Sequence, residues 1–451
     1  MRGSIRLSRL SSAFLGGLII FAAALSPLDV KAAGDWNFEN KTTGTSASGQ
    51  IWYAIATSDS GRYVAAAVLG GDIWVSGDYG STWSNKTSAT SATSQYWQAI
   101  TISADGSRIY AGVSGGDIWA SADYGESWIN KTAATAAAYQ TYTSLATDDS
   151  GKNIAATVFG GDIWISSDYG DTWANKTTAT AASGLNYYGI TLSSDGRYIT
   201  AAANSGGLWT SSDYGDNWTL ASGTSGAAAF RVVAASSSGQ YQLAATFGGN
   251  LWTTSDYGAS WTEGYNGVHG YAQWGVAVSA SGQYMFVATE VAGDVYVSRD
   301  YGASWTNDTS GTAASGSNLE GSNHYALRVL AASANGQYVY VGYTTPRDIF
   351  VANNSALAPQ PTPTPTTTPA ASLVLDHNPV RQPSGGEVEI ATAATPTPTP
   401  TASPLPTTKP ATDKAVSEAT SNSQKSRLYY VPIAVISLLL MVVLVRLMLP
   451  K

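Results

Sequence analysis

The sequence contains no cysteine, and only 12% of its 451 residues are charged. The absence of cysteine excludes disulfide bonds, thiol catalysis and cysteine-ligated metal sites. The scarcity of charge argues against a helical bundle, which needs charged outer faces. The formal net charge of −8 argues against a nucleic-acid partner, because such binding needs a basic surface. Glycine, by contrast, is abundant at 46 residues, which indicates many tight turns.

The first 34 residues are typical of an export signal. Arg2, Arg6 and Arg9 precede an apolar run at 13–25, and Val30-Lys31-Ala32 offers a small-residue cleavage site. The alternative is an uncleaved anchor, but the run is short for a bilayer. We therefore expect residues 1–34 to be a signal peptide and the chain that follows to be exported.

The other end of the chain predicts a membrane anchor. Tyr429–Val445 is a run of 17 residues without a charge, and it continues into an apolar stretch after Arg446. We expect one transmembrane helix at 428–449 and a cytoplasmic stub at 450–451. Residues 355–427 are rich in Thr-Pro alternations, which favour an extended, disordered stalk. The prediction is a single-pass protein of the cell membrane with its large domain outside.

A repeated string dominates the rest of the sequence. Asp-Tyr-Gly-x-x-Trp recurs with spacings of 45, 45, 45, 43 and 44 residues, starting at Asp78, Asp123, Asp168, Asp213, Asp256 and Asp300. Each unit contains four short β patterns separated by Gly, Asp and Ser turns, and no pattern has a helical period. Four strands in about 45 residues is the period of a β-propeller blade.

The ends of the repeat region complete each other. Asn40-Lys41-Thr42 matches the fourth strand of the first full unit, Asn85-Lys86-Thr87, although no unit precedes it. Asp348-Ile349-Phe350-Val351 matches a third strand, and no fourth strand follows it. We therefore predict an all-β, seven-bladed propeller over residues 35–354, in which the N-terminal strand closes the last blade.

The repeated string resembles the Asp-box, or bacterial neuraminidase repeat. In Ser166-Ser167-Asp168-Tyr169-Gly170-Asp171-Thr172-Trp173 the whole Ser-x-Asp-x-Gly-x-Thr-Trp pattern is present. Similar boxes occur in sialidases, xyloglucanases, sortilin-type receptors and photosystem II assembly factors. The resemblance implies a propeller whose box hairpin joins the third and fourth strands, on the face opposite the ligand.

The box aspartates are expected to be structural. An Asp in a tight turn accepts backbone N–H groups, the glycine supplies a positive φ, and the tryptophan packs beneath the turn. We assign this role to Asp78, Asp123, Asp168, Asp213, Asp256 and Asp300. The recurring Asn-x-Thr is expected to be a polar repeat of the strand end; glycan attachment is the alternative.

Candidate ligand-binding residues lie where first and third strands begin. Aromatic residues gather at the first-strand starts: Trp52, Tyr53, Trp97, Tyr142, Tyr187, Tyr188, Phe230, Trp274 and Tyr325. Third strands open with Asp72, Asp117, Asp162, Asn250, Asp294 and Asp348. Aromatic and acidic groups suit stacking on sugar rings and hydrogen bonding to hydroxyls. In the alternative interpretation the acids cap their own turns and the aromatics seal the blades.

The last two units depart from the consensus on the same side. Glu290 and Arg347 fall in second-to-third-strand loops, whereas His269, Glu320, His324 and Arg328 fall in connections leading into first strands. With Trp274 these seven residues are the predicted binding site, since function on a rigid scaffold usually lies in variable loops. A surface ion-pair cluster is the alternative explanation.

These features favour a surface-anchored recognition or adhesion propeller, without enzymatic activity, that binds an extracellular glycan or protein. No metal or cofactor motif is found, since the Asp-Tyr-Gly turns lack the ligand spacing of a calcium loop. A glycoside hydrolase of sialidase-like or xyloglucanase-like type is the alternative, although the Phe-Arg-Ile-Pro motif of sialidases is missing. A membrane-protein assembly factor similar to the photosystem II family is the third possibility.

Overall fold

The computed structural model describes residues 36–224, 229–247, 250–264, 273–289, 294–309, 327–343 and 347–357. For Gln273, Trp274, Leu327 and Arg328 it describes the backbone alone. The predicted signal peptide, nearly all of the stalk and the predicted transmembrane helix at 428–449 lie outside these ranges. Within them, no helix is both long and apolar enough to cross a membrane.

The described chain is built from β-strands, as predicted, and each repeat contributes four. The first strands are β2 (Trp52–Thr57), β6 (Gln95–Ile102), β10 (Gln140–Thr147), β14 (Leu185–Leu192), β18 (Phe230–Ala235), β22 (Gln273–Val278) and β26 (Leu327–Ala332). The second strands are β3 (Val64–Gly71), β7 (Ile109–Gly116), β11 (Ile154–Gly161), β15 (Ile199–Ala203), β19 (Gln242–Thr246), β23 (Met285–Thr289) and β27 (Tyr338–Tyr343).

The outer strands are shorter. The third strands are β4 (Ile73–Ser76), β8 (Ile118–Ser121), β12 (Ile163–Ser166), β16 (Gly207–Ser211), β20 (Leu251–Thr254), β24 (Val295–Ser298) and β28 (Ile349–Asn353). The fourth strands are β5 (Ser84–Asn85), β9 (Ile129–Asn130), β13 (Ala174–Asn175), β17 (Thr219–Leu220), β21 (Thr262–Gly264), β25 (Thr306–Asn307) and β1 (Phe38–Asn40). A 3₁₀ turn, η2 (Ser355–Leu357), follows the last strand.

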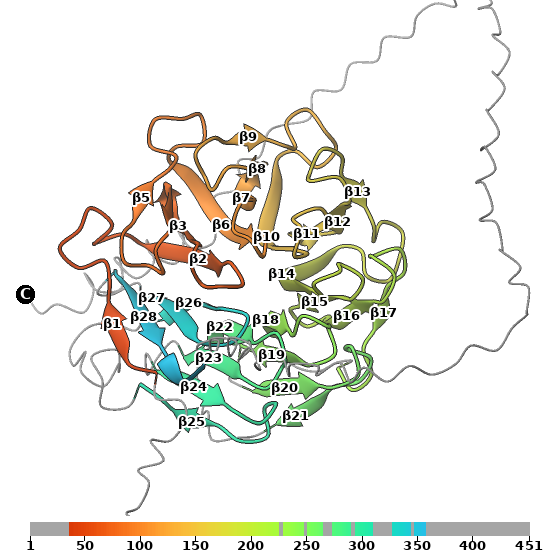
Figure 1. The fold of residues 1–451 in the computed structure, drawn as a ribbon. Coiled ribbons are helices and arrows are strands. Elements are labelled where there is room, and N and C mark those ends of the chain that lie inside the picture. Colours follow the sequence, from red (N-terminus) through yellow and green to blue (C-terminus); the bar gives the residue numbers. More distant parts are fainter. Residues whose placement is uncertain are drawn as a thin grey trace, which may run out of the picture. The chain divides into compact units, whose positions relative to one another are not determined.

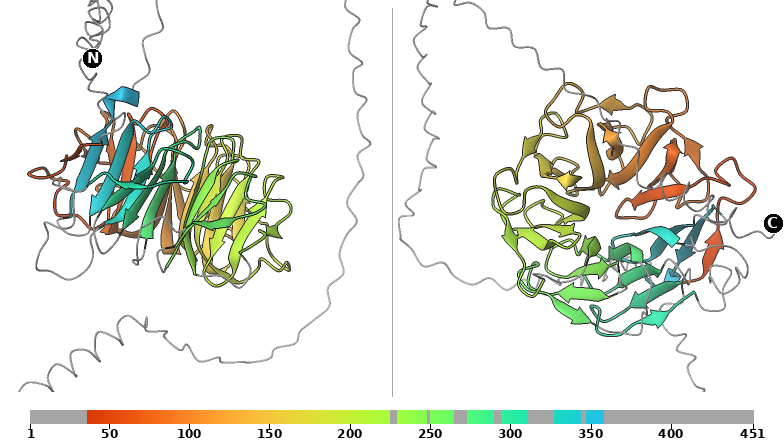
Figure 2. Two further views of the ribbon diagram at one scale, coloured as in Figure 1. Left: turned by 90° about the horizontal axis from the view of Figure 1, so that it is seen from below. Right: turned by 180° about the vertical axis from the view of Figure 1, so that it is seen from behind.

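Neighbouring strands of a repeat pair antiparallel, and the repeats stand around a common centre (Figure 1). First strands lie innermost and fourth strands outermost, and the strands run between two faces of the ring (Figure 2). One face, here the glycine-turn face, carries the second-to-third-strand turns such as Gly70-Gly71. The other, the box face, carries the Asp-box turns together with the first-to-second-strand turns, because the Tyr79 N–H donates to the Arg62 carbonyl (3.0 Å).

The hydrophobic cores lie between neighbouring sheets. In one such core, Ile73 of β4 packs with Trp97 of β6 and Ile109 of β7, and all three side chains are buried. Five first strands carry a fully buried aromatic residue near their start: Trp52, Trp97, Tyr142, Tyr187 and Phe230. Because a sheet buries its faces only against its neighbours, the repeats are stable as a closed set.

The N-terminal strand closes this set, as the sequence predicts. β1 pairs with β28 through Phe38↔Ala352, Glu39↔Val351 and Asn40↔Phe350. The Asn40 amide donates to one oxygen of Asp348 (2.9 Å), and the Thr42 hydroxyl donates to the other (2.9 Å). The first and last strands of the described chain therefore belong to one four-stranded sheet.

Each box aspartate holds its own turn. The Asp168 carboxylate accepts the Ser166 hydroxyl (2.8 Å) and both the backbone N–H (2.9 Å) and the hydroxyl (2.6 Å) of Thr172. Burial opposes ionisation, but these hydrogen bonds outweigh it and lower the pKa of Asp168 below its usual value. The tryptophan Nε1–H then donates to the turn glycine, from Trp173 to Gly170 (3.0 Å).

The positive backbone angle of the box is shared by two residues, whereas the sequence analysis assigned it to glycine alone. Tyr79 has φ of 62° and Gly80 has φ of 80°. The left-handed conformation is unfavourable for tyrosine. It is offset by packing, since the Tyr79 ring stacks on Tyr338 of the neighbouring repeat with centroids 4.7 Å apart. Tyr124 packs in the same way on Tyr63.

Candidate functional site: the mouth of the central cavity

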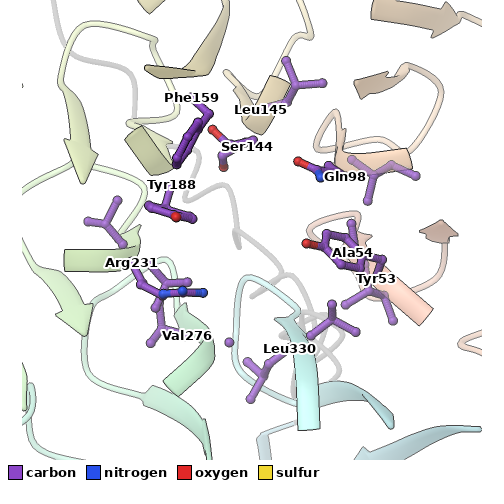
Figure 3. Close-up of a pocket in the computed structure, with 18 of the residues that line it drawn as sticks. Tyr53, Ala54, Gln98, Ser144, Leu145, Phe159, Tyr188, Arg231, Val276 and Leu330 are labelled. Atoms are coloured by element: carbon purple, nitrogen blue, oxygen red, sulfur yellow. The ribbon is translucent and has the colours of Figure 1, made fainter. Parts of the chain in front are cut away.

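A cavity of about 440 Å³ lies at the centre of the ring (Figure 3). Residues of all seven first strands line it, and β11 contributes Phe159. A volume of this size, surrounded by apolar walls with a few polar groups, is typical of a ligand pocket. The cavity is therefore the strongest candidate site in the described part of the chain.

A β-bulge in every first strand shapes the entrance of the cavity. In β2 the register shifts between Trp52 and Ala54, so that the pairing with β3 skips Tyr53. The same shift recurs in the other six first strands. A bulge inserts one extra residue and redirects its side chain. We call the seven bulged residues the collar: Tyr53, Gln98, Thr143, Tyr188, Arg231, Trp274 and Arg328.

The collar residues differ in chemistry from repeat to repeat, and the five with described side chains all line the cavity. Tyr53 and Gln98 lie across the cavity from Tyr188 and Arg231 (Figure 3). The collar lies near the first-strand starts and so belongs to the glycine-turn face. This is the face on which the sequence predicts ligand binding.

An aliphatic layer follows the collar along the channel. It consists of Ile55, Ile100, Leu145, Val233, Val276 and Leu330, one from each of six first strands. The residue between collar and layer is small where neighbouring strands approach most closely. A Cβ at Gly189 would lie 2.8 Å from the Arg231 carbonyl oxygen, so this position in β14 requires glycine.

An aromatic and cationic cluster stands on one side of the collar. The Arg231 guanidinium lies over the Tyr188 ring at 4.7 Å and over the Phe247 ring at 4.8 Å. Phe159 meets Tyr188 edge to face at 5.6 Å, and Phe159 and Phe247 are 44% and 53% exposed. Among the described residues that line the cavity, Arg231 carries the only charge. The entrance therefore presents one cation between exposed ring faces.

The opposite end of the channel is held by a closed circle of backbone hydrogen bonds. Each residue donates its N–H to the carbonyl of the next in the order Asp59, Ala104, Asp149, Ser194, Ser237, Ala280 and Ala334, and the Ala334 N–H returns to Asp59. A smaller cavity of about 150 Å³ opens here beside the side chains of Asp59 and Asp149. Although Asp149 is an exposed residue, partial desolvation of its carboxylate, with a further contribution from Asp59, Asp148 and Asp195, raises its pKa to about 6.

The acids that open the third strands hold the fourth strands and do not line the cavity. Asp72 accepts the Asn85 amide (2.8 Å) and the hydroxyls of Thr87 (3.0 Å) and Thr93 (2.8 Å). The bonds from the Asn amide and from the Thr two residues later recur at Asp117, Asp162, Asp294 and Asp348. The Asn-x-Thr repeat is thus the partner of these acids, which was not foreseen from the sequence.

The predicted site residues are placed only in part. Trp274 and Arg328 occupy collar positions of β22 and β26; Arg328 thus lies within a strand, not in the connection expected from the sequence. Arg347 lies exposed in the turn between β27 and β28, where its carbonyl accepts the Gly49 N–H (3.1 Å), and it does not line the cavity. Glu290, Glu320, His269 and His324 lie outside the described residues.

The collar as a set was missed by sequence reasoning, which treated Tyr53 and Tyr188 as part of one aromatic group with the buried residues. A signal was present, since the residue at the collar position changes between polar, aromatic and cationic types, whereas the residue before it is aromatic in five of the seven repeats. Among the described residues no group of three or more His, Asp or Glu side chains is arranged to hold a metal ion.

No protein-family model matches the sequence, and no curated protein matches it either. Solved structures do resemble the fold. YCF48 bound to a D1 peptide is similar with a TM-score of 0.53 and 12% identity, over 71% of this chain and 95% of that one. YCF48 from Cyanidioschyzon merolae is similar with a TM-score of 0.52 and 14% identity, over 70% of this chain and 98% of that one.

A GH74 xyloglucanase from Xanthomonas campestris is similar with a TM-score of 0.53 and 15% identity, over 71% of this chain and 54% of the enzyme. This chain therefore spans about half of the enzyme's length. At these identities the likeness concerns the fold, and it shows that the described strands form a β-propeller.

Proposed function

We propose that this chain is a cell-surface recognition protein, a seven-bladed propeller that binds an extracellular glycan or protein at its collar. In this proposal residues 1–34 direct export, residues 355–427 form the stalk, and a helix at 428–449 anchors the chain in the membrane. The circle of seven backbone hydrogen bonds supports the blade count, because its last member returns to its first.

The observation that carries the proposal is the contrast between the collar and everything around it. The box turns, the third-strand acids and the aliphatic layer keep the same chemistry in nearly every repeat. The collar does not: it contains Tyr53, Gln98, Thr143, Tyr188 and Arg231 at five equivalent positions. Side chains that differ on an otherwise uniform scaffold, and that line a cavity, are expected to select a ligand.

Two further facts support recognition of a partner. Tyr188, Phe247 and Arg231 are residue types enriched at binding hot spots, and two of their ring faces are presented at the entrance. A propeller of similar fold, YCF48, is known bound to a peptide. We transfer to this chain only the idea that such a ring can hold an extended partner.

The test is a binding screen of the full-length chain on a glycan array and on a library of extracellular peptides. Any ligand that is found is then measured against collar variants. Trp274→Ala, Arg328→Ala and Tyr188→Ala are each expected to weaken binding by about tenfold or more, the range of a binding hot spot. Thr143→Ala is the matched collar control, because its hydroxyl already bonds the carbonyls of Thr157 and Tyr187.

Buried residues such as Trp97 and Tyr142 cannot serve as controls, because both side chains are fully buried and their loss would unfold the ring. Equal losses at every collar position would indicate a surface that uses the whole ring. No loss at any position would remove the collar from consideration. The alternative function, glycoside hydrolysis, is tested separately with a fluorogenic sialoside and with a glucan. Hydrolysis of either substrate would show that the chain is an enzyme and would contradict the proposed recognition function.

A further inference from the structure

The chemistry of the cavity changes along its axis. Its entrance holds the Arg231 cation between the rings of Tyr188 and Phe247. Below the collar the wall becomes aliphatic, with Ile55, Leu145 and Val233 among the lining residues. A ligand that fits both parts must carry a negative charge at the entrance and an apolar group deeper in the channel.

The position of Arg231 suits a carboxylate. The rings on which the guanidinium packs restrict its rotation, so that little conformational freedom is lost when an anion binds to it. A guanidinium binds a carboxylate through two parallel hydrogen bonds, which is stronger and more directional than a contact with a neutral group. The positive charge of Arg231 is opposite in sign to the net charge of −8 of the whole chain.

The wall below the collar disfavours a sugar. Aliphatic side chains offer no hydrogen bonds, and each hydroxyl placed there without a partner would lose its water at a cost of about 1–3 kcal/mol. An apolar side chain gains from the same burial, at about 25 cal/mol for each Å² removed from water. The depth of the cavity therefore selects an apolar group.

We propose that the cavity binds the C-terminal residue of a polypeptide, with the terminal carboxylate on Arg231 and an apolar terminal side chain against the aliphatic layer. The terminal residue carries both groups on a single Cα, so one chain end satisfies the entrance and the wall together. An internal Asp or Glu is followed by further residues, so its polar main chain on both sides would have to enter the collar. This inference rests on the proposed function and narrows its ligand to a protein.

The test uses short Gly/Ser-rich peptides that end in Leu, Phe, Ser or Lys, each with a free or an amidated C-terminus. Binding to the full-length chain is followed by fluorescence anisotropy. Peptides ending in free Leu or Phe are expected to bind, and amidation or a terminal Ser or Lys is expected to weaken binding by about tenfold or more.

Three variants localise the contact. Arg231→Gln is expected to abolish the difference between free and amidated peptides, and Arg231→Lys to restore part of it because the charge is kept but not the fork. Arg108→Gln is the matched control: Arg108 also lies over a tyrosine ring, at 4.1 Å from Tyr169, but outside the cavity. It is expected to leave the affinity unchanged. Val276→Thr is expected to weaken the Leu and Phe peptides only.

The outcomes separate this inference from the proposed function. Equal binding of free and amidated peptides, or binding that survives Arg231→Gln, overturns the carboxylate contact. A uronate-bearing glycan or a free fatty acid that binds in place of peptides, and depends on Arg231, overturns the C-terminal residue as the ligand while recognition at the collar stands. If no ligand of any class depends on the collar, the proposed function fails as well.

Discussion

The pairing of the N-terminal segment with β28, which closes the ring, can be tested by substituting Asp348. This carboxylate is buried and accepts three side chains from the N-terminal segment: Asn40 (2.9 Å), Thr42 (2.9 Å) and Ser48 (2.9 Å). Asp348→Ala removes the acceptor and leaves the strands otherwise intact. We expect it to destabilise the protein and to release residues 36–49 from β28.

The magnitude follows from the burial of the three donors. Thr42 is fully buried, and leaving its hydroxyl without the carboxylate costs about 1–3 kcal/mol. Asn40 and Ser48 are half-buried and regain water, so each loses a net hydrogen bond of about 0.5–1 kcal/mol. The free energy of unfolding is therefore expected to fall by about 2–5 kcal/mol.

Asp72→Ala is the matched control, because Asp72 makes the same bonds to Asn85, Thr87 and Thr93 within one repeat. Denaturant unfolding is expected to show similar losses for both variants. Hydrogen exchange should separate them: Asp348→Ala speeds exchange in residues 36–49, whereas Asp72→Ala leaves that segment protected. Unchanged exchange at 36–49 in Asp348→Ala, or equal opening in both variants, would refute the closure argument.

Three further outcomes are expected from stability measurements. Asp168→Ala should lower the free energy of unfolding by about 1 kcal/mol, the low end for lost hydrogen bonds because Thr172 is exposed, while ligand binding stays intact. The raised pKa of Asp149 means that the folded state binds its proton more tightly than the unfolded state, so stability should fall as pH rises from about 4 to about 6. Asp149→Asn should remove that slope and stabilise the protein at pH 7 by no more than about 1 kcal/mol, since solvent screens this exposed group. Gly189→Ala should destabilise by about 1–3 kcal/mol, because its Cβ meets the backbone of β18, and a wild-type melting temperature would contradict that contact.

Ring closure was predictable because comparison with the complete repeats shows which strand is absent at each end of the repeat region. Asn40-Lys41-Thr42 is a fourth-strand pattern without a preceding unit, and the pattern at Asp348 is a third strand without a following one. The structure pairs the two in the predicted way. The argument needed no knowledge of side-chain contacts, since strand order within a repeat determines which strand is absent.

The partner of the third-strand acids was harder to predict, although one repeat revealed it. Asn250 stands where five other repeats have an acid, and Glu263 stands where those repeats have the Asn of Asn-x-Thr; the remaining repeat has Gly207 and Leu220 at these positions. In the structure the Asn250 amide donates to the Glu263 carboxylate, so the pair is kept with its members exchanged. The five repeats that keep both motifs hide such a dependence, because the motifs recur with the same period and neither varies alone.

The collar escaped prediction because a bulge breaks the alternation from which strand faces are read. In a regular strand Trp52 and Tyr53 point to opposite sides of the sheet and Ala54 returns to the side of Trp52. The extra residue in β2 shifts the residues after Tyr53 by one, so the pattern of the sequence no longer gives the faces. Composition alone therefore grouped Tyr53 and Tyr188 with the aromatics that pack between sheets.

The bulge also explains how one uniform scaffold can carry collar residues of five different types at seven positions. The backbone pairing of the first strand with the second skips the bulged residue, so changing its side chain leaves the strand ladder intact. The buried aromatic before it and the aliphatic residue after it make the contacts on which stability depends. Substitutions at Gln98 are for that reason expected to change ligand choice with little change in stability, whereas substitutions one residue earlier, at Trp97, would cost about 3–5 kcal/mol. The separation allows selection to alter the ligand of such a ring without weakening the ring.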